Sequence, residues 1–177
     1  MSGFRMTAKL KIISGGQTGV DRAALDAAIE LGIPCGGWCP KGRKAEDGPL
    51  DPKYPLKETD CSDYAVRTEW NVRDSDGTLI VTRGKPTGGT AYTIAMARVH
   101  KKPCLVIDLD KLSSPRKWGP REETLDPRLR GDDIVKWLTE NNISNLNIAG
   151  PRESNMRGIY NDAKEYFKKW LFSRSSG

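Results

Sequence analysis

The sequence is poor in the residues that build metal centres and disulfide frameworks. It contains one histidine and four cysteines, and the cysteines are irregularly spaced with no CxxC pair. Because zinc ribbons and disulfide scaffolds need such pairs, we expect buried thiols at Cys35, Cys39, Cys61 and Cys104, and no metal site. The histidine, His100, stands among basic residues where we expect a helix to end, and we assign it no catalytic role.

Long apolar runs are also missing. No uninterrupted run approaches the roughly 20 residues of a membrane span, and residues 1–8 contain no apolar stretch of signal-peptide length. We therefore expect a cytoplasmic protein with no membrane partner. The formal net charge of +6 favours an acidic partner, and its sign alone leaves nucleic acid, a membrane surface and a small phosphorylated ligand open. Because the basic residues are spread along the chain, a dedicated nucleic-acid arm is disfavoured.

Short apolar segments alternate with segments of helical period. We expect strands at residues 9–14, 35–39, 78–82, 103–109 and 145–150, and helices at residues 20–32, 62–75, 89–101, 132–142 and 156–172. This alternation predicts an α/β protein, a Rossmann-like three-layer sandwich with a mostly parallel sheet of about five or more strands.

The length of 177 residues favours a single domain, residues 1–177, with a core at about 9–171. Residues 111–130 show neither period, and we expect an irregular excursion there.

Glycine-rich loops follow two of the predicted strands. In an open parallel sheet, ligands bind outside the carboxyl ends of the strands. The first loop, residues 15–19, allows an anion to approach the backbone at the start of a helix, and Arg22 could reach the same anion. The loop matches neither the Walker A pattern nor GxGxxG, and a purely structural turn is the alternative. Thr18 and Asp21 have the spacing of a capping box.

The third loop places Gly88, Gly89 and Thr90 directly before a helix, where Thr90 can act as a cap or as a phosphate ligand. We expect the first and third loops to converge on one anion site. The fifth loop adds Arg152 and Ser154, which suit a planar or phosphate-bearing anion.

The second loop, residues 40–49, mixes proline and glycine with cations and carboxylates. We expect Arg43, Glu46 and Asp47 to border the pocket, as in a recognition loop; a solvated surface loop is the alternative. On the helix expected at residues 62–75, Arg67, Asn71 and Asp74 share one face. That face is either a wall of the pocket or an exposed, salt-bridged surface.

These patterns select candidate binding residues and no catalytic residue. The candidates are Gly15, Gly16, Gln17, Thr18, Gly19, Arg22, Lys41, Gly42, Arg43, Glu46, Asp47, Arg67, Asn71, Asp74, Gly88, Gly89, Thr90, Arg152 and Ser154.

Several segments carry a family resemblance. The sequence resembles the molybdenum cofactor carrier proteins in GGQTGVDRAALDAA, GGWCPKGRKAEDGP, RTEWNVRDSDGTLIV, GGT and NIAGPRES, in order, between about residues 9 and 171. That family is similar to a Rossmann-like superfamily that includes the nucleoside-monophosphate phosphoribohydrolases, once called lysine decarboxylases, and DNA-processing protein A.

The resemblance implies a carrier of molybdenum cofactor (molybdopterin), a phosphorylated pyranopterin whose dithiolene already ligates the metal, or of a similar nucleotide-like phosphate ligand. It also implies a homo-oligomer, with molybdoenzymes as recipients of the cofactor.

Two other functions stay open. A phosphoribohydrolase needs a carboxylate beside the ribose, and the hydrolases carry it in the motif PGGxGTxxE. Residues 87–94 contain no glutamate, although Glu69 or Glu46 could supply a carboxylate from a neighbouring loop. A single-stranded nucleic-acid-binding protein would interleave basic and aromatic residues along a strand, and this sequence does not.

Overall fold

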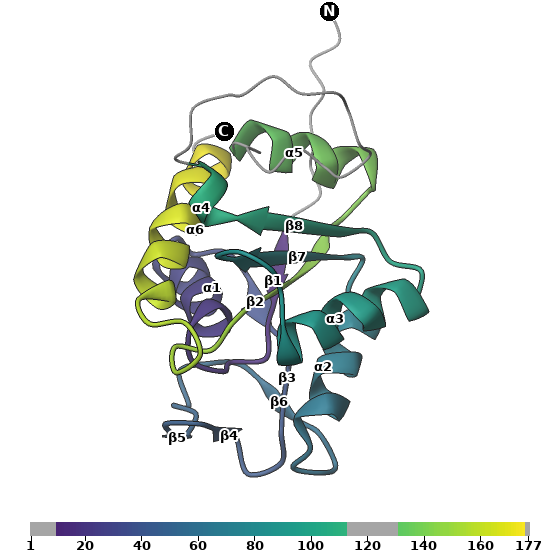
Figure 1. Ribbon diagram of the computed structural model, residues 1–177, viewed down its shortest axis with the longest axis vertical. Helices are drawn as coiled ribbons and strands as arrows, with labels where there is room; N and C mark the ends of the chain where they lie inside the picture. Colours follow the sequence, from purple (N-terminus) through teal and green to yellow (C-terminus); the bar gives the residue numbers. More distant parts are fainter. Residues whose placement is uncertain (1–9, 113–130, 176–177) are drawn as a thin grey trace, which may run out of the picture.

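Five strands form one parallel sheet in the computed structural model, which describes residues 10–112 and 131–175 (Figure 1). Their order is β2 (Cys35–Gly36), β1 (Lys11–Ile13), β9 (Asn145–Ala149), β7 (Gly77–Thr82) and β8 (Cys104–Asp108). All neighbours are parallel, and the last strand in the sequence, β9, lies in the middle, where Leu146 pairs with Ile12 and Ile148 with Leu79. The predicted α/β fold class with a parallel sheet is confirmed.

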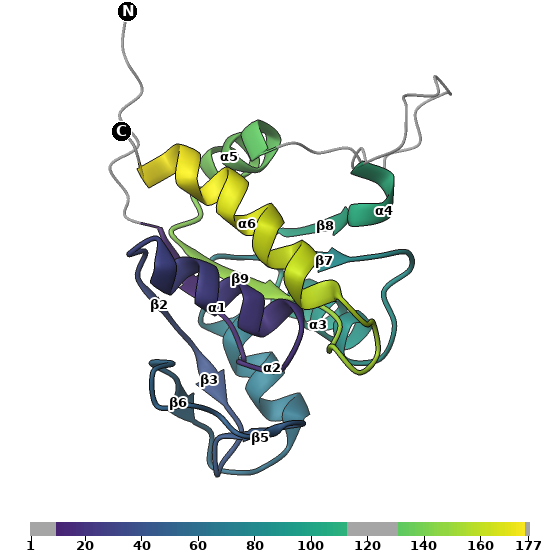
Figure 2. The same ribbon diagram turned by 90° about the vertical axis from the view of Figure 1, so that its left-hand side faces the viewer.

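Helices cover both faces of the sheet. They are α1 (Val20–Glu30), α2 (Tyr64–Arg73), α3 (Gly88–Val99), α4 (Leu109–Leu112), α5 (Gly131–Glu140) and α6 (Ile159–Ser175). Figure 2 shows α1 and α6 packed together in front of the sheet and α2 and α3 packed together behind it. Every residue of β7 is buried, because both faces of this strand are covered, and the strand therefore reads as an apolar run without polar alternation.

The second predicted strand, residues 35–39, is interrupted. The chain leaves the main sheet at Gly37, whose φ is 133°, and β3 (Trp38–Cys39) pairs instead with β6 (Lys57–Glu58). Asn71 of α2 holds this departure, because its amide accepts from the Trp38 N–H (2.7 Å) and donates to the Trp38 carbonyl (2.9 Å). The prediction of one continuous strand was therefore wrong.

A small satellite region follows this break. A hairpin of β4 (Lys44–Ala45) and β5 (Gly48–Pro49) lies between β3 and β6 in the sequence. The region has its own apolar cluster, which also includes a residue of α1. Its buried members are Leu25, Cys39, Ala45, Leu50, Tyr54 and Leu56.

Of the excursion expected at residues 111–130, only residues 111 and 112 are described, and they belong to α4; the rest lies outside the described residues. Cys39 is buried, but Cys61 is exposed, so the expectation of four buried thiols was wrong. In the part of the chain that is described, no helix is long and apolar enough to cross a membrane.

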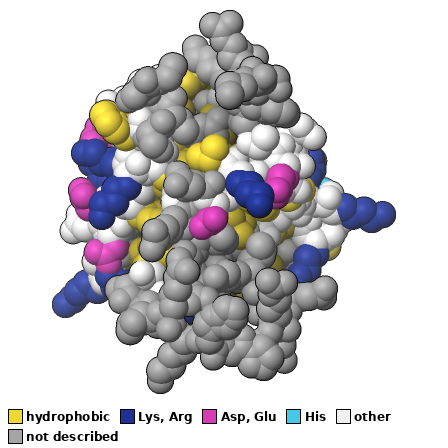
Figure 3. Space-filling model, turned by 90° about the horizontal axis from the view of Figure 1, so that it is seen from above, with side chains coloured by type: hydrophobic (Ala, Val, Ile, Leu, Met, Phe, Trp, Pro, Cys, Tyr) yellow, Lys and Arg dark blue, Asp and Glu magenta, His cyan; other side chains and the backbone are white. Residues whose placement is uncertain are grey.

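The surface mixes charges of both signs. Seen from above, the described Lys and Arg side chains are interspersed with Asp and Glu (Figure 3). Surface ion pairs such as Lys136 with Glu140 and Lys164 with Glu30 join opposite charges. The excess of positive charge is therefore not gathered into one patch on the described part of this face.

Candidate functional site

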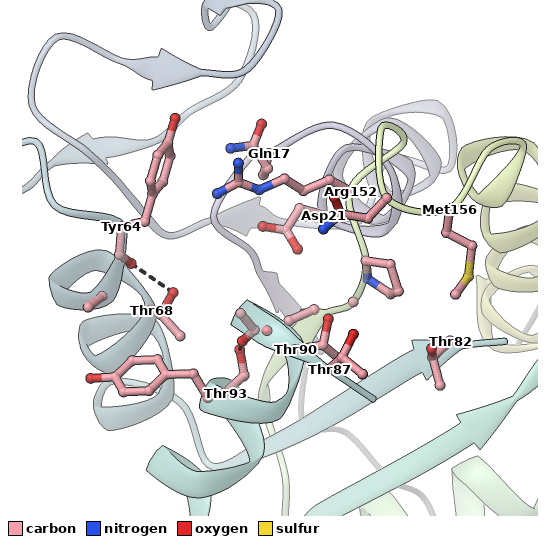
Figure 4. A pocket seen from close by; sticks show the side chains of 18 of the residues that line it. Gln17, Asp21, Tyr64, Thr68, Thr82, Thr87, Thr90, Thr93, Arg152 and Met156 are labelled. Atoms are coloured by element: carbon pink, nitrogen blue, oxygen red, sulfur yellow. Dashed lines mark hydrogen bonds between the residues drawn. The ribbon is translucent and has the colours of Figure 1, made fainter. Parts of the chain in front are cut away.

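A cavity of about 360 Å³ lies at the carboxyl ends of β1, β9 and β7. Its walls come from the loop after β1, the first turns of α2, the loop from β7 into α3, and the segment after β9 (Figure 4). These segments meet because β9 separates β1 from β7 while α1 and α3 leave towards opposite faces of the sheet. The predicted first and third loops thus meet at one cavity; that it holds an anion remains a prediction.

Six of the predicted binding residues line this cavity. They are Gln17, Arg67, Gly88, Gly89, Thr90 and Arg152.

The N-terminus of α3 forms one end of the cavity. The N-cap is Thr87, which makes no side-chain cap hydrogen bond, and a Cβ placed on Gly88 or Gly89 would meet no atom within 4 Å among the described residues. The first N–H groups of a helix have no acceptor within the helix, and they attract anions. Lys85 lines the same end. We call Lys85, Thr87, Gly88 and Gly89 the α3 end.

Gln17 lies on the opposite wall from Thr87 and Thr90 (Figure 4). Its side-chain carbonyl accepts hydrogen bonds from the N–H of Thr18 (3.1 Å) and of Glu46 (2.9 Å). Gln17 is only 3% exposed, and its amide nitrogen Nε2 has no hydrogen-bond partner among the described residues. A buried donor without a partner is costly, so this nitrogen is suited to meet a ligand.

A buried ion pair joins the first turn of α1 to α2. Arg67 Nη1 donates to Asp21 Oδ2 at 3.1 Å, and the two side chains are 11% and 4% exposed. Burial raises the pKa of the Asp21 carboxyl, and the charge of Arg67 opposes this shift. The expected capping box was wrong: the N-cap of α1 is Gly19, no side chain caps it, and Asp21 faces inward to Arg67.

One aromatic and one cationic side chain complete the wall. The Arg152 guanidinium lies 4.6 Å from the centre of the Tyr64 ring, in cation–π contact. Figure 4 shows Arg152 extending past Gln17 towards Tyr64. The cavity lining therefore includes three cations, Arg67, Lys85 and Arg152, against one carboxylate, that of Asp21. Such a site favours an anionic ligand rich in acceptor oxygens.

The glycines of the first loop serve packing. A Cβ on Gly15 would overlap the Arg67 guanidinium, and one on Gly16 would overlap Leu56. At Gly19, where φ is 80°, a Cβ would overlap the carbonyl oxygen of Pro151. The space beside each glycine is thus filled by protein atoms. Sequence reasoning could not see this, because the partners lie far away along the chain.

Glu46 fastens the satellite region to the site without lining the cavity. Its carboxylate accepts hydrogen bonds from the hydroxyls of Thr18 and Ser154 and from the Ser154 N–H. Beside it, Arg22 pairs with Asp47 and also donates to the Gly16 carbonyl.

Two of these predicted residues, Thr18 and Arg22, do not line the cavity. Together with Gly19 they border a separate hollow of about 290 Å³, next to Glu153 and Tyr160.

The remaining predicted residues hold the satellite region together. Arg43, at a φ of 53°, donates to the carbonyls of Leu50, Asp51, Tyr54 and Leu56.

Other candidates make similar local contacts. The Gly42 N–H donates to Glu58 and the Lys41 N–H to the Cys61 carbonyl. Asp74 accepts a hydrogen bond from the Trp38 indole (2.8 Å). Asn71 accepts one from the backbone N–H of the same tryptophan.

Sequence reasoning missed several lining residues. Lys85 and Thr87 stand in the third loop, whose glycines had drawn attention, so proximity to those glycines was the available signal. Tyr64 and Asp21 carried no local signal of a cavity, because only the tertiary fold brings the first turns of α1 and α2 to its lining. Among the described residues, no group of three or more His, Cys, Asp or Glu could hold a metal ion.

The carboxylates considered for hydrolysis lie outside the lining. Glu69 contacts His100 Nε2 at 3.3 Å, and Glu46 is engaged as described above.

Known proteins are similar to this chain in sequence and in fold. The model of a family described as "Circularly permutated YpsA SLOG family" matches residues 12–171. A solved structure from Syntrophus aciditrophicus SB, named "Putative molybdenum carrier protein", is similar with a TM-score of 0.78 and 46% sequence identity, over 93% of this chain and 96% of that chain. No curated protein matches this chain at a significant level.

Proposed function

Because the chain belongs to the circularly permutated YpsA SLOG family, we propose that its cavity binds a phosphorylated planar ligand, molybdenum cofactor or a similar nucleotide-like compound, and carries it without changing it chemically. The observation that carries this proposal is the buried amide nitrogen of Gln17, which has no partner among the described residues, in a cavity lined by more cations than carboxylates. The relative named as a molybdenum carrier supports the choice of ligand.

The phosphate is assigned to the α3 end. There the helix dipole and the N–H groups at the start of the helix favour an anion, and Lys85 adds a positive charge. The open space beside Gly88 and Gly89 lets phosphate oxygens approach the backbone.

The planar part of the ligand is assigned to the opposite wall. Tyr64 and the guanidinium of Arg152 provide flat surfaces there, and Gln17 and Arg67 provide donors. This donor set fits the oxygen-rich, anionic pterin cofactor as cargo. The dithiolene of that cofactor supplies the ligands of its metal, so the protein needs to hold only the pterin and the phosphate.

Native mass spectrometry tests the proposal. Protein purified from a host that makes molybdenum cofactor should retain a bound mass that is missing after purification from a host unable to make it. The Lys85→Ala variant should retain roughly tenfold less, because a charge-assisted contact to the phosphate is lost. Lys136→Ala removes the same charge from the surface of α5 and should retain as much as the wild type. No bound mass from either host would contradict the assignment of this cargo.

The same proposal predicts no turnover. Asp21 is the carboxylate in the described lining, and its pairing with Arg67 leaves it poorly placed to act on a ribose. We expect no free base or ribose 5-phosphate when the protein is incubated with adenosine monophosphate and the products are separated by chromatography. Free base whose formation is abolished by Glu69→Gln would instead make the protein a phosphoribohydrolase.

A further inference from the structure

The orientation of the Gln17 amide is set by its surroundings. Its oxygen accepts from two backbone N–H groups, those of Thr18 and Glu46. A flipped amide would turn its NH₂ group towards both donors and lose both hydrogen bonds. The nitrogen Nε2 is therefore left as a donor without a partner among the described residues, on a side chain that lines the cavity.

Glu46 keeps this donor in place. The backbone N–H of Glu46 binds the Gln17 oxygen, while its carboxylate binds the hydroxyls of Thr18 and Ser154. One residue thus ties the turn between β4 and β5 to the loops after β1 and β9. A donor held in this way loses little conformational freedom when a ligand binds. Ordering it therefore costs little binding free energy.

Arg67 provides a second buried donor beside that of Gln17. Arg67 is 9% exposed, and its Nε also lacks a hydrogen-bond partner within the described ranges, whereas its Nη1 is engaged by Asp21. The Arg67 guanidinium lies against Gly15, two residues before Gln17. We call Gln17, Arg67 and Arg152 the donor wall.

We propose that Gln17 is a specificity-determining residue that selects ligands whose ring presents an oxo group to the donor wall, as 4-oxopteridines and 6-oxopurines do, over rings with an amino group there. This inference rests on the proposed function and names the class of ring that the site accepts. An oxo oxygen satisfies the buried donor. An amino group would set donor against donor and leave Gln17 Nε2 unpaired.

Inosine monophosphate and adenosine monophosphate test this selection. They share ribose and phosphate and differ in the ring at the oxo or amino position. We expect the full-length protein to bind inosine monophosphate at least about tenfold more tightly in isothermal titration, the effect of one unpaired buried donor.

Gln17→Glu is nearly isosteric and replaces the donor by an acceptor, so it should abolish or reverse this ratio. Gln17→Met, which has neither donor nor added charge, should bring the ratio near one and serves if the glutamate variant is unstable. Lys85→Ala, at the α3 end, should weaken both nucleotides by the same factor and leave the ratio unchanged.

The outcomes separate the two proposals. Binding of both nucleotides with equal affinity, or a wild-type ratio that persists in both Gln17 variants, would overturn the role of Gln17 and leave the proposed function standing. Binding of neither nucleotide, without retention of a bound mass from the cofactor-producing host, would overturn the proposed function and this inference with it.

Discussion

Replacing Asp21 by asparagine is expected to lower the free energy of unfolding by about 3 to 5 kcal/mol, the usual effect of removing one partner from a buried ion pair. The variant leaves the guanidinium of Arg67 buried without its counter-charge, since the two side chains are 4% and 11% exposed. Urea denaturation followed by circular dichroism measures the change.

Asp47→Asn is the matched control. It removes a carboxylate that pairs with Arg22, which lies in α1 as Asp21 does. The Asp47 side chain, however, is 50% exposed. Surface pairs contribute about 0 to 1 kcal/mol, so this variant should unfold almost as the wild type does. Equal losses for the two variants would show that burial does not set the contribution of the Asp21–Arg67 pair.

Gly19→Ala is expected to destabilise the fold by about 3 kcal/mol or more. Two effects add: the backbone has φ 80° and ψ −130°, which L residues rarely adopt, and a Cβ would overlap the Pro151 carbonyl oxygen. The overlap would also push apart the loops after β1 and β9, both of which line the cavity. Denaturant unfolding measures the loss.

Gly32→Ala separates the two effects. Gly32 also has a positive φ, 66°, but a Cβ added there would meet no described atom within 4 Å. The free energy of unfolding of Gly32→Ala should fall only by the cost of the backbone conformation, about 1 to 2 kcal/mol. If Gly19→Ala were no more destabilising than Gly32→Ala, the close approach to Pro151 would have no energetic weight.

The types and order of the main elements were predictable from the sequence. Strand β7 is buried on both faces and its centre reads as a short apolar run, and helices such as α1 show the helical period with a glycine, Gly32, at the end. The family resemblance was confirmed by the family match over residues 12–171 together with the 46% identical structure named "Putative molybdenum carrier protein". Strands of two residues, such as β3 and β6, contain too few positions to show any period. The sequence therefore could not distinguish them from the neighbouring loops.

The class of fold and the places where loops with glycines meet the helix N-termini were predictable from the sequence, because these depend on local periodicity and on the backbone freedom of single residues. Which side chains enter the cavity depends instead on contacts between distant segments. Gln17 faces inward because Glu46 binds its oxygen from another loop, and Asp21 leaves the helix cap for Arg67. Such contacts join residues 29 and 46 positions apart, and a local pattern carries no information on pairs at that separation.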